Sequence, residues 1–174
     1  VLVIYETKAL ELWWNALPSF WKDLLTDQAM TSKKPSKEEL HSIINIKNLK
    51  INRFIQDAEP ISRLTNIEFL DMSDSKIDDL SPLYGLYHLK SLNIKNTVIS
   101  DLTSLSNLKN LKELNIENTK VASLKPLHEL SNLSKVYADG SKVNRDEVIA
   151  LKGKQRQVTV VYQTDDLRLW WGNL

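Results

Sequence analysis

The dominant hydrophobic pattern of this sequence is a 22-residue period that runs from Leu64 to Val143. Apolar side chains return at seven positions of the unit L-x-x-L-x-x-L-x-[LI]-x-x-[ST]-x-[IV]-x-x-L-x-x-L-x-x, and polar residues fill most of the other positions. The first of these registers contains Leu64, Leu86, Leu108 and Leu130. A fixed period of this length predicts a solenoid, in which each repeat is one coil that stacks on its neighbours.

Each unit predicts a short strand followed by a tight return. The L-x-[LI] step places two side chains on one face of a strand, because strand side chains alternate between faces. The later apolar residues are three apart, which is typical of 3₁₀ turns, and Pro82 and Pro126 fit such segments. Because one coil cannot bury enough apolar surface to fold alone, we expect an α/β solenoid whose strands form one parallel sheet.

This unit resembles the leucine-rich repeats of the 22-residue, internalin-like class found on many bacterial surface proteins, and the resemblance extends from Ile46 to about Val161. It implies a right-handed superhelix with a parallel sheet on its concave face and short helical or 3₁₀ returns. Such repeats usually carry an asparagine that bonds adjacent coils. This chain has hydroxyl residues instead, namely Ser75, Thr97, Thr119 and Ser141. We expect these hydroxyls to form a weaker version of the same ladder.

The residues before the repeats predict a strand and a helical, tryptophan-rich N-terminal cap over residues 1–45. Four apolar residues recur at the i, i+3, i+4, i+7 spacing of an amphipathic helix: Leu10, Trp13, Trp14 and Leu17. Another helix follows with Trp21, and a third begins at the capping box Ser36–Glu39. Because the end of a solenoid needs a cover, we interpret the three tryptophans as structural. The alternative is an aromatic platform that binds a sugar or a peptide.

The array continues into the last part of the chain. Residues Asn144 to Lys152 predict a short helix that Gly153 ends. Residues 158–160 then fall 22 residues after the preceding strand, so we expect them to continue the same sheet. We therefore assign residues 46–163 to about five repeat coils and a closing strand.

A longer repetition relates the two ends of the sequence. Residues 158–174 repeat residues 1–17 at an offset of 157, with nine identical positions that include two adjacent tryptophans. We expect the chain to be one module of a tandem array, with residues 164–174 as the truncated start of the next module. The alternatives for Trp170 and Trp171 are folding back on the last coil and fraying. Our hypothesis is that this end self-associates through them.

Charge and composition narrow the classes of partner. Lys and Arg together number 23 against 22 Asp and Glu, which leaves a net charge of +1 and no field that attracts nucleic acid. No apolar run approaches the about 20 residues that a membrane-spanning helix needs. We therefore expect neither nucleic-acid binding nor membrane insertion.

Motifs for catalysis or metal binding are missing from the sequence. Cysteine is absent, and the three histidines, His41, His88 and His128, occupy unrelated registers of the repeat. Four aspartates cluster at Asp71, Asp74, Asp78 and Asp79, but they lack the glycine and terminal glutamate of a calcium-binding loop. No nucleophile elbow, phosphate loop or dinucleotide fingerprint occurs. We expect no enzyme activity, no cofactor and no metal.

The strand residues that alternate with the buried pair predict the functional surface. They point outward on the concave side and combine mixed charges, amides and two aromatic rings. The predicted protein-binding residues are Phe69, Asp71, Ser91, Asn93, Lys95, Glu113, Asn115, Glu117, Lys135, Tyr137 and Asp139, beside Ser73 and the first-coil residues Asn48, Lys50 and Asn52. The alternative is that they are only solvated strand residues. We expect a protein ligand, with Phe69 and Tyr137 as anchors.

These observations favour non-catalytic protein–protein recognition by one module of a tandem leucine-rich repeat protein. The resemblance to internalin-like proteins implies a bacterial surface or secreted adhesion module, and we favour that location over the cytoplasm. Two alternatives stay open. One is an intracellular scaffold or regulatory subunit, and the other is a structural spacer whose modules stack.

Overall fold

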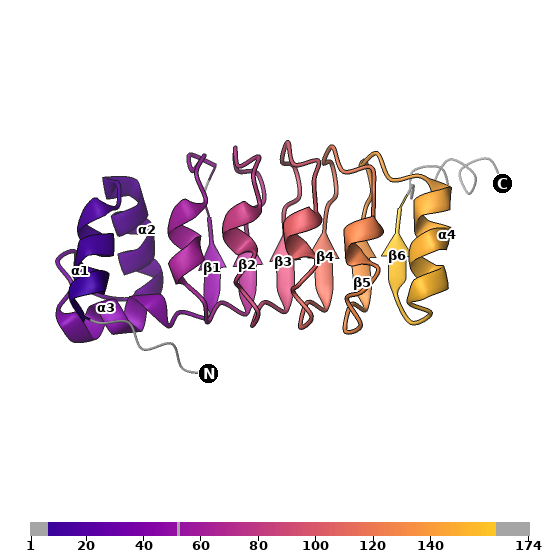
Figure 1. The fold of residues 1–174 in the computed structure, drawn as a ribbon. Helices are drawn as coiled ribbons and strands as arrows, with labels where there is room; N and C mark the ends of the chain where they lie inside the picture. Colours follow the sequence, from indigo (N-terminus) through magenta and orange to yellow (C-terminus); the bar gives the residue numbers. More distant parts are fainter. Residues whose placement is uncertain (1–6, 52, 163–174) are drawn as a thin grey trace.

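The structure is a computed structural model that describes residues 7–51 and 53–162. Six strands form one parallel sheet in the order β1-β2-β3-β4-β5-β6, as the repeat predicts, and the return segments lie along one side of it (Figure 1). The strands are β1 (Asn48–Lys50), β2 (Phe69–Asp71), β3 (Ser91–Asn93), β4 (Glu113–Asn115), β5 (Lys135–Tyr137) and β6 (Thr159–Val161). The predicted strand at residues 1–5, Asn52, Trp170 and Trp171 lie outside the described residues.

The 22-residue period sets the register of the sheet. Leu70 pairs with Leu92, and Leu92 pairs with Leu114. The last pairing differs from the expectation, because Val136 pairs with Val160, which lies 24 residues further on. The return between β5 and β6 contains a full α-helix and is two residues longer than a regular return. A shift of two residues keeps the same side chains facing inward, so the predicted continuation of the sheet holds with a corrected register.

Apolar positions of the repeat form one continuous core, as predicted. In the coil around β4 all seven are fully buried: Leu108, Leu111, Leu114, Ile116, Val121, Leu124 and Leu127. Complete burial of such aliphatic side chains contributes about 1.5–3 kcal/mol each. Because each inner coil packs on the coils before and after it, this burial depends on stacking rather than on a single repeat.

The returns are short 3₁₀ segments, as predicted. Aspartates that precede two of them form hydrogen bonds that the sequence analysis did not identify. The 3₁₀ segments are η1 (Glu59–Arg63), η2 (Ser81–Leu83), η3 (Thr103–Leu105) and η4 (Lys125–Leu127). Asp79 accepts a hydrogen bond from the Ser81 backbone N–H at 2.8 Å, and Asp101 accepts one from the Thr103 N–H at 2.9 Å. Both aspartates also accept from the hydroxyl of the same partner residue, and this bond lowers their pKa most, followed by the N–H bond.

As pH falls, the free energy of unfolding is expected to decrease more steeply for the native protein than for a variant that carries both Asp79→Asn and Asp101→Asn. The pKa of both carboxyls is lowered on folding. Their stabilisation is therefore complete above the unfolded-state value of about 3.9 and is lost as pH falls through the folded-state value. The amides still accept the turn hydrogen bonds but do not titrate. Urea unfolding at a series of pH values between about 5 and 2.5 measures this difference. Identical pH slopes for the two proteins would contradict the prediction.

Three helices precede the sheet and lie at one end of the row (Figure 1). They are α1 (Thr7–Ala16), α2 (Ser19–Ala29) and α3 (Lys37–Ile44). The predicted capping box opens α3, because the Glu39 N–H donates to the Ser36 hydroxyl and the Ser36 N–H donates to the Glu39 carboxylate. Helix α2 continues past Thr26 to Ala29. Thr26 is buried, and its hydroxyl donates to the Lys22 carbonyl within the helix.

Helix α4 (Arg145–Lys154) occupies the return position between β5 and β6. Asn144 caps its first turn by accepting a hydrogen bond from the Glu147 N–H at 3.0 Å. The predicted stop at Gly153 is wrong by a short distance, because the helix includes this glycine and ends after Lys154. Gln155 follows and is buried, and its amide donates to the Leu127 carbonyl at 2.6 Å. This bond ties the end of the helix to the preceding coil.

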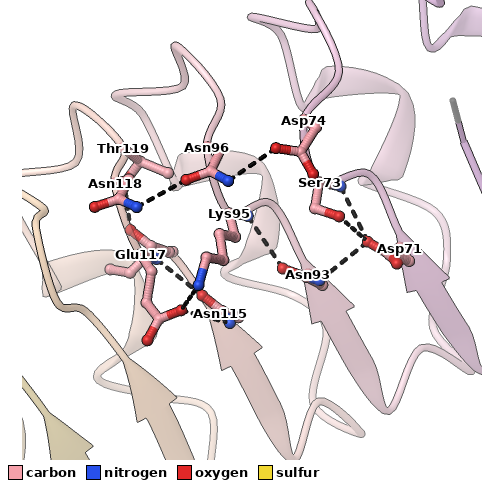
Figure 2. Close-up of polar contacts among 11 residues, drawn as sticks. Asp71, Ser73, Asp74, Asn93, Lys95, Asn96, Asn115, Glu117, Asn118 and Thr119 are labelled. Carbon is pink, nitrogen blue, oxygen red and sulfur yellow. Dashed lines mark hydrogen bonds and ion pairs between the residues drawn. The ribbon is translucent and has the colours of Figure 1, made fainter. Parts of the chain in front are cut away.

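The turns after the strands contain a ladder at an unexpected position. Asp74, Asn96 and Asn118 have positive φ angles of 59°, 57° and 54°, and Gly140 continues the register at 66°. The Asn96 amide donates to Asp74 at 2.8 Å, and the Asn118 amide donates to Asn96 at 2.8 Å (Figure 2). These are residue types that tolerate a left-handed backbone, so the same register meets both the backbone and the bonding requirement.

The predicted hydroxyl ladder between coils is therefore wrong. The hydroxyls of Thr97 and Thr119 each donate to the carbonyl three residues earlier, in their own coil, at 2.7 Å. Ser141 does the same to Ala138 at 2.6 Å. A hydroxyl is too short to reach the next coil, whereas the amide one position earlier does reach it.

Replacing Gly140 by alanine is expected to destabilise the fold by about 1–2 kcal/mol or more. A left-handed backbone strains the new side chain, and its Cβ would lie 2.1 Å from the Asn118 Oδ1. Gly140→Asn is the matched variant. Its Cβ displaces the same Asn118 oxygen, but asparagine tolerates this backbone and its amide can donate to that oxygen and so extend the ladder, which alanine cannot do. Chemical unfolding should rank wild type and Gly140→Asn above Gly140→Ala. The account of the ladder is contradicted if both substitutions cost the same.

Candidate protein-binding face of the sheet

Polar and aromatic side chains cover the side of the sheet opposite the buried core, which we call the exposed sheet face. Strand pairing aligns them in two rows across the coils. One row contains Asn48, Phe69, Ser91, Glu113 and Lys135, and the other contains Lys50, Asp71, Asn93, Asn115 and Tyr137. Two residues beyond the ends of these strands lie Ser73, Lys95, Glu117 and Asp139. The structure thus brings together the side chains that the sequence predicted to share a surface.

A hydrogen-bond network centred on Asp71 connects the side chains of β1, β2 and β3 on this face. The Asp71 Oδ1 accepts from the Ser73 hydroxyl at 2.7 Å, from the Ser73 N–H at 3.0 Å and from the Asn93 amide at 3.0 Å (Figure 2). Lys50 lies 3.5 Å from the other carboxylate oxygen. Neighbouring strands are therefore joined through their side chains as well as their backbones, which fixes the shape of this surface.

A second network holds the central coils. The Lys95 ammonium donates to the Glu117 carboxylate at 2.7 Å, and this bond raises the pKa of Lys95 (Figure 2). Asn115 accepts from the Glu117 N–H at 2.9 Å, and Asn93 accepts from the Lys95 N–H at 3.1 Å. Most of these side chains are half-buried and hydrogen-bonded to one another, which restricts their rotamers before any partner binds. A surface ordered in this way loses less entropy on binding.

Two aromatic side chains of the face, on β2 and β5, lie on either side of the central strands. Phe69 is 49% exposed and borders a hollow of about 370 Å³. The hollow is also lined by Gln28, Asn48, Lys50, Asp71, Ser91 and Asn93. Tyr137 is half-buried, with the Lys135 ammonium 4.9 Å from its ring centroid. The two rings differ in setting, because Phe69 offers open apolar surface and Tyr137 is already covered in part by a cation.

Gln28 is a member of this surface that the sequence analysis missed. It comes from α2, outside the repeats, and its amide accepts from the Lys50 N–H at 3.0 Å and donates to the Lys50 carbonyl at 2.6 Å. The side chain thereby pairs with β1 as a further strand would. No repeat position predicts it, because the contact depends on how the helices pack against the first coil.

The described part of the chain contains neither a cluster of metal-binding side chains nor a membrane-spanning helix. Among residues 7–51 and 53–162, no three His, Cys, Asp or Glu side chains gather in a geometry that holds a metal ion. No helix in the described part of the chain is long and apolar enough to cross a membrane.

Comparison with solved structures connects this architecture to known proteins. Internalin C2 from Listeria monocytogenes shares 29% identity with a TM-score of 0.64, over 72% of this chain and 55% of that chain. The chain has an internalin-like leucine-rich repeat fold. A second Listeria internalin, InlF, matches at 22% identity and a TM-score of 0.63, over 82% of this chain and 49% of that one. This internalin-like chain thus spans about half the length of both internalins.

A more distant neighbour shares the fold alone. A leucine-rich repeat protein of Leptospira interrogans matches at 17% identity and a TM-score of 0.54, over 70% of this chain and 38% of that chain. No family model and no curated protein matches the sequence. The internalin-like chain is therefore placed by its coil geometry and by the likeness to internalin C2, and proteins of this fold commonly serve protein–protein interaction.

Proposed function

We propose that the exposed sheet face recognises a protein and that the chain has no catalytic role. The observation that carries this proposal is a side-chain network that is ordered across neighbouring coils and leaves Phe69 49% exposed beside a hollow. A solvated strand surface needs neither feature. An apolar ring surrounded by satisfied polar groups is the arrangement of a binding hot spot and its rim.

The binding surface is proposed to be the concave one, with the predicted residues from Phe69 to Asp139 as its contacts. Helices α1 to α3 are proposed to serve as the N-terminal cap, with Trp13, Trp14 and Trp21 as structural residues. Trp14 and Trp21 are buried and Trp13 is partly buried, so they present little ring surface to a sugar or peptide. This burial favours the cap over the aromatic platform.

An adhesion module on a bacterial surface, or in a secreted protein, is the role that the likeness to internalin C2 supports best. The scaffold and spacer alternatives predict different partners. A scaffold binds a protein of the producing cell, whereas an adhesin binds one from another cell or surface. A spacer has no partner that depends on the sheet face.

Paired affinity baits test the proposal. The first bait is the native chain, and the second carries Phe69→Ala, Asn115→Ala and Tyr137→Ala. The matched control carries Tyr84→Ala, Tyr87→Ala and Asn107→Ala, which remove two aromatic rings and one amide from exposed positions outside the sheet. We expect at least one protein to be held by the native and control baits and lost by the sheet-face bait. Equal retention by all three baits would overturn the proposal and favour the spacer.

A further inference from the structure

The last coil of the sheet has an incompletely covered end. Val160 on β6 holds the inward position that belongs to Leu70, Leu92 and Leu114 on earlier strands, where the exposed fraction is at most 2%. Val160 is only partly buried, as is Tyr162 after it. On the earlier strands, the following coil covers this inward position completely. The partial exposure of Val160 therefore shows that no further coil covers it within the described residues.

Helix α4 presents an apolar side chain on the same side. Glu147 turns back to the preceding coil, where its carboxylate accepts from the Ser123 hydroxyl at 3.1 Å and from the Leu124 N–H at 2.6 Å. Ile149 lies two residues later, about 200° around the helix, so it points away from that coil. Its side chain is 56% exposed. Ile149, Val160 and Tyr162 together define what we call the open end.

The sequence specifies what comes after the open end. Residues 164–174 repeat residues 7–17, which contain α1, and six of these eleven positions are identical. Only Tyr162 and Gln163 separate the last residue of β6 from this copy. Two residues span about 7 Å at full extension, which is too short to carry the copy away from α4 and β6.

Helix α1 also has an apolar side chain, Leu12, that is not buried within its own module. Leu10 and Trp14 are buried, and α1 packs against α3. Leu12 lies about 200° from Leu10 around the helix, and it is 64% exposed. Figure 1 places α1 at the outer end of the row. The repeat keeps this leucine as Leu169.

We propose that the open end is a docking surface for an α1-type helix, the copy encoded by residues 164–174, which contacts it through Leu169. One helix then has two contacts. Its Leu10–Trp14 side packs within its own module, and its Leu12 side covers the last coil of the module before. Consecutive modules thereby form one continuous solenoid. This surface is separate from the exposed sheet face and does not depend on the proposed function.

Thiol labelling tests the docking, because the native chain contains no cysteine. Ile149→Cys in the full chain places one thiol at the open end, and Tyr84→Cys is the matched control, since Tyr84 is 53% exposed on the return side. We expect the Ile149→Cys thiol to react about tenfold more slowly than the control thiol. Adding Leu169→Asp should restore the rate to within about twofold of the control. Adding Asn173→Asp, which introduces a carboxylate without removing an apolar side chain, should leave the protection in place.

Each outcome decides the proposal. Protection that Leu169→Asp abolishes supports docking of the α1-type helix. Its independence of protein concentration assigns the helix to the same chain, and its increase with concentration assigns it to a second copy. Equal rates for Ile149→Cys and Tyr84→Cys overturn the proposal, as does protection that survives Leu169→Asp.

Discussion

Replacing Trp21 by alanine is expected to lower the free energy of unfolding by about 3–5 kcal/mol. Trp21 is fully buried on α2, and it is among the largest completely buried side chains of the described residues. Its loss removes a large apolar surface and leaves a cavity in the core, on the helix that packs against α3. Urea or guanidinium unfolding with matched slopes measures the change.

Trp21→Phe is the control that separates volume from polarity. The indole Nε1 of Trp21 has no hydrogen-bond partner among the described residues. Removing an unpartnered buried N–H offsets about 1–3 kcal/mol of the lost packing. Trp21→Phe should therefore cost much less than Trp21→Ala. The packing account is contradicted if Trp21→Ala changes stability by under about 1 kcal/mol, or if phenylalanine costs as much as alanine.

Replacing Phe69 by alanine is expected to weaken partner binding by about 30-fold to 1000-fold, which corresponds to about 2–4 kcal/mol. The ring stands beside the hollow and is surrounded by the bonded side chains of Lys50, Asp71 and Asn93. A partner that covers it removes its exposed apolar surface from water within a polar rim.

Stability should change little in the same variant, by about 0.5 kcal/mol or less, because half of the ring is already exposed in the free chain. Tyr87→Ala removes a ring of similar exposure from the return side and should leave affinity unchanged. Titration calorimetry or surface binding against the captured partner, with unfolding run in parallel, measures both effects. An affinity loss below about threefold would show that Phe69 is not an anchor.

The spacing of apolar residues within each repeat predicted the features of the fold that form within a single coil. The L-x-[LI] step and the apolar residues three apart define which side chains face inward, so the strands, the 3₁₀ returns and the buried positions agree with the sequence. The sheet-face residues follow from the same alternation, since Phe69 and Asp71 flank the buried Leu70. Their binding role remains a proposal.

The features that the sequence did not predict depend mainly on contacts between segments that the 22-residue period does not relate. The β6 register shifted by two residues because the α4 return is longer than a regular one. Gln28 joined the sheet face through the packing of α2 on the first coil. The sequence analysis places the ladder one residue too late. The series Asp74, Asn96, Asn118 and Gly140 could have indicated the correct position, because Asp, Asn and Gly all tolerate a positive φ.

Site-specific photocrosslinking tests most directly whether the exposed sheet face binds a protein. A benzophenone amino acid replaces Ser91, which pairs with Phe69 on the neighbouring strand, or Ser106, on the return side after η3. Both serines are half-buried, so the two probes have similar surroundings before binding. With the captured partner present, we predict a crosslinked complex from the Ser91 position and none from Ser106. Crosslinking from Ser106 alone would contradict recognition through the sheet.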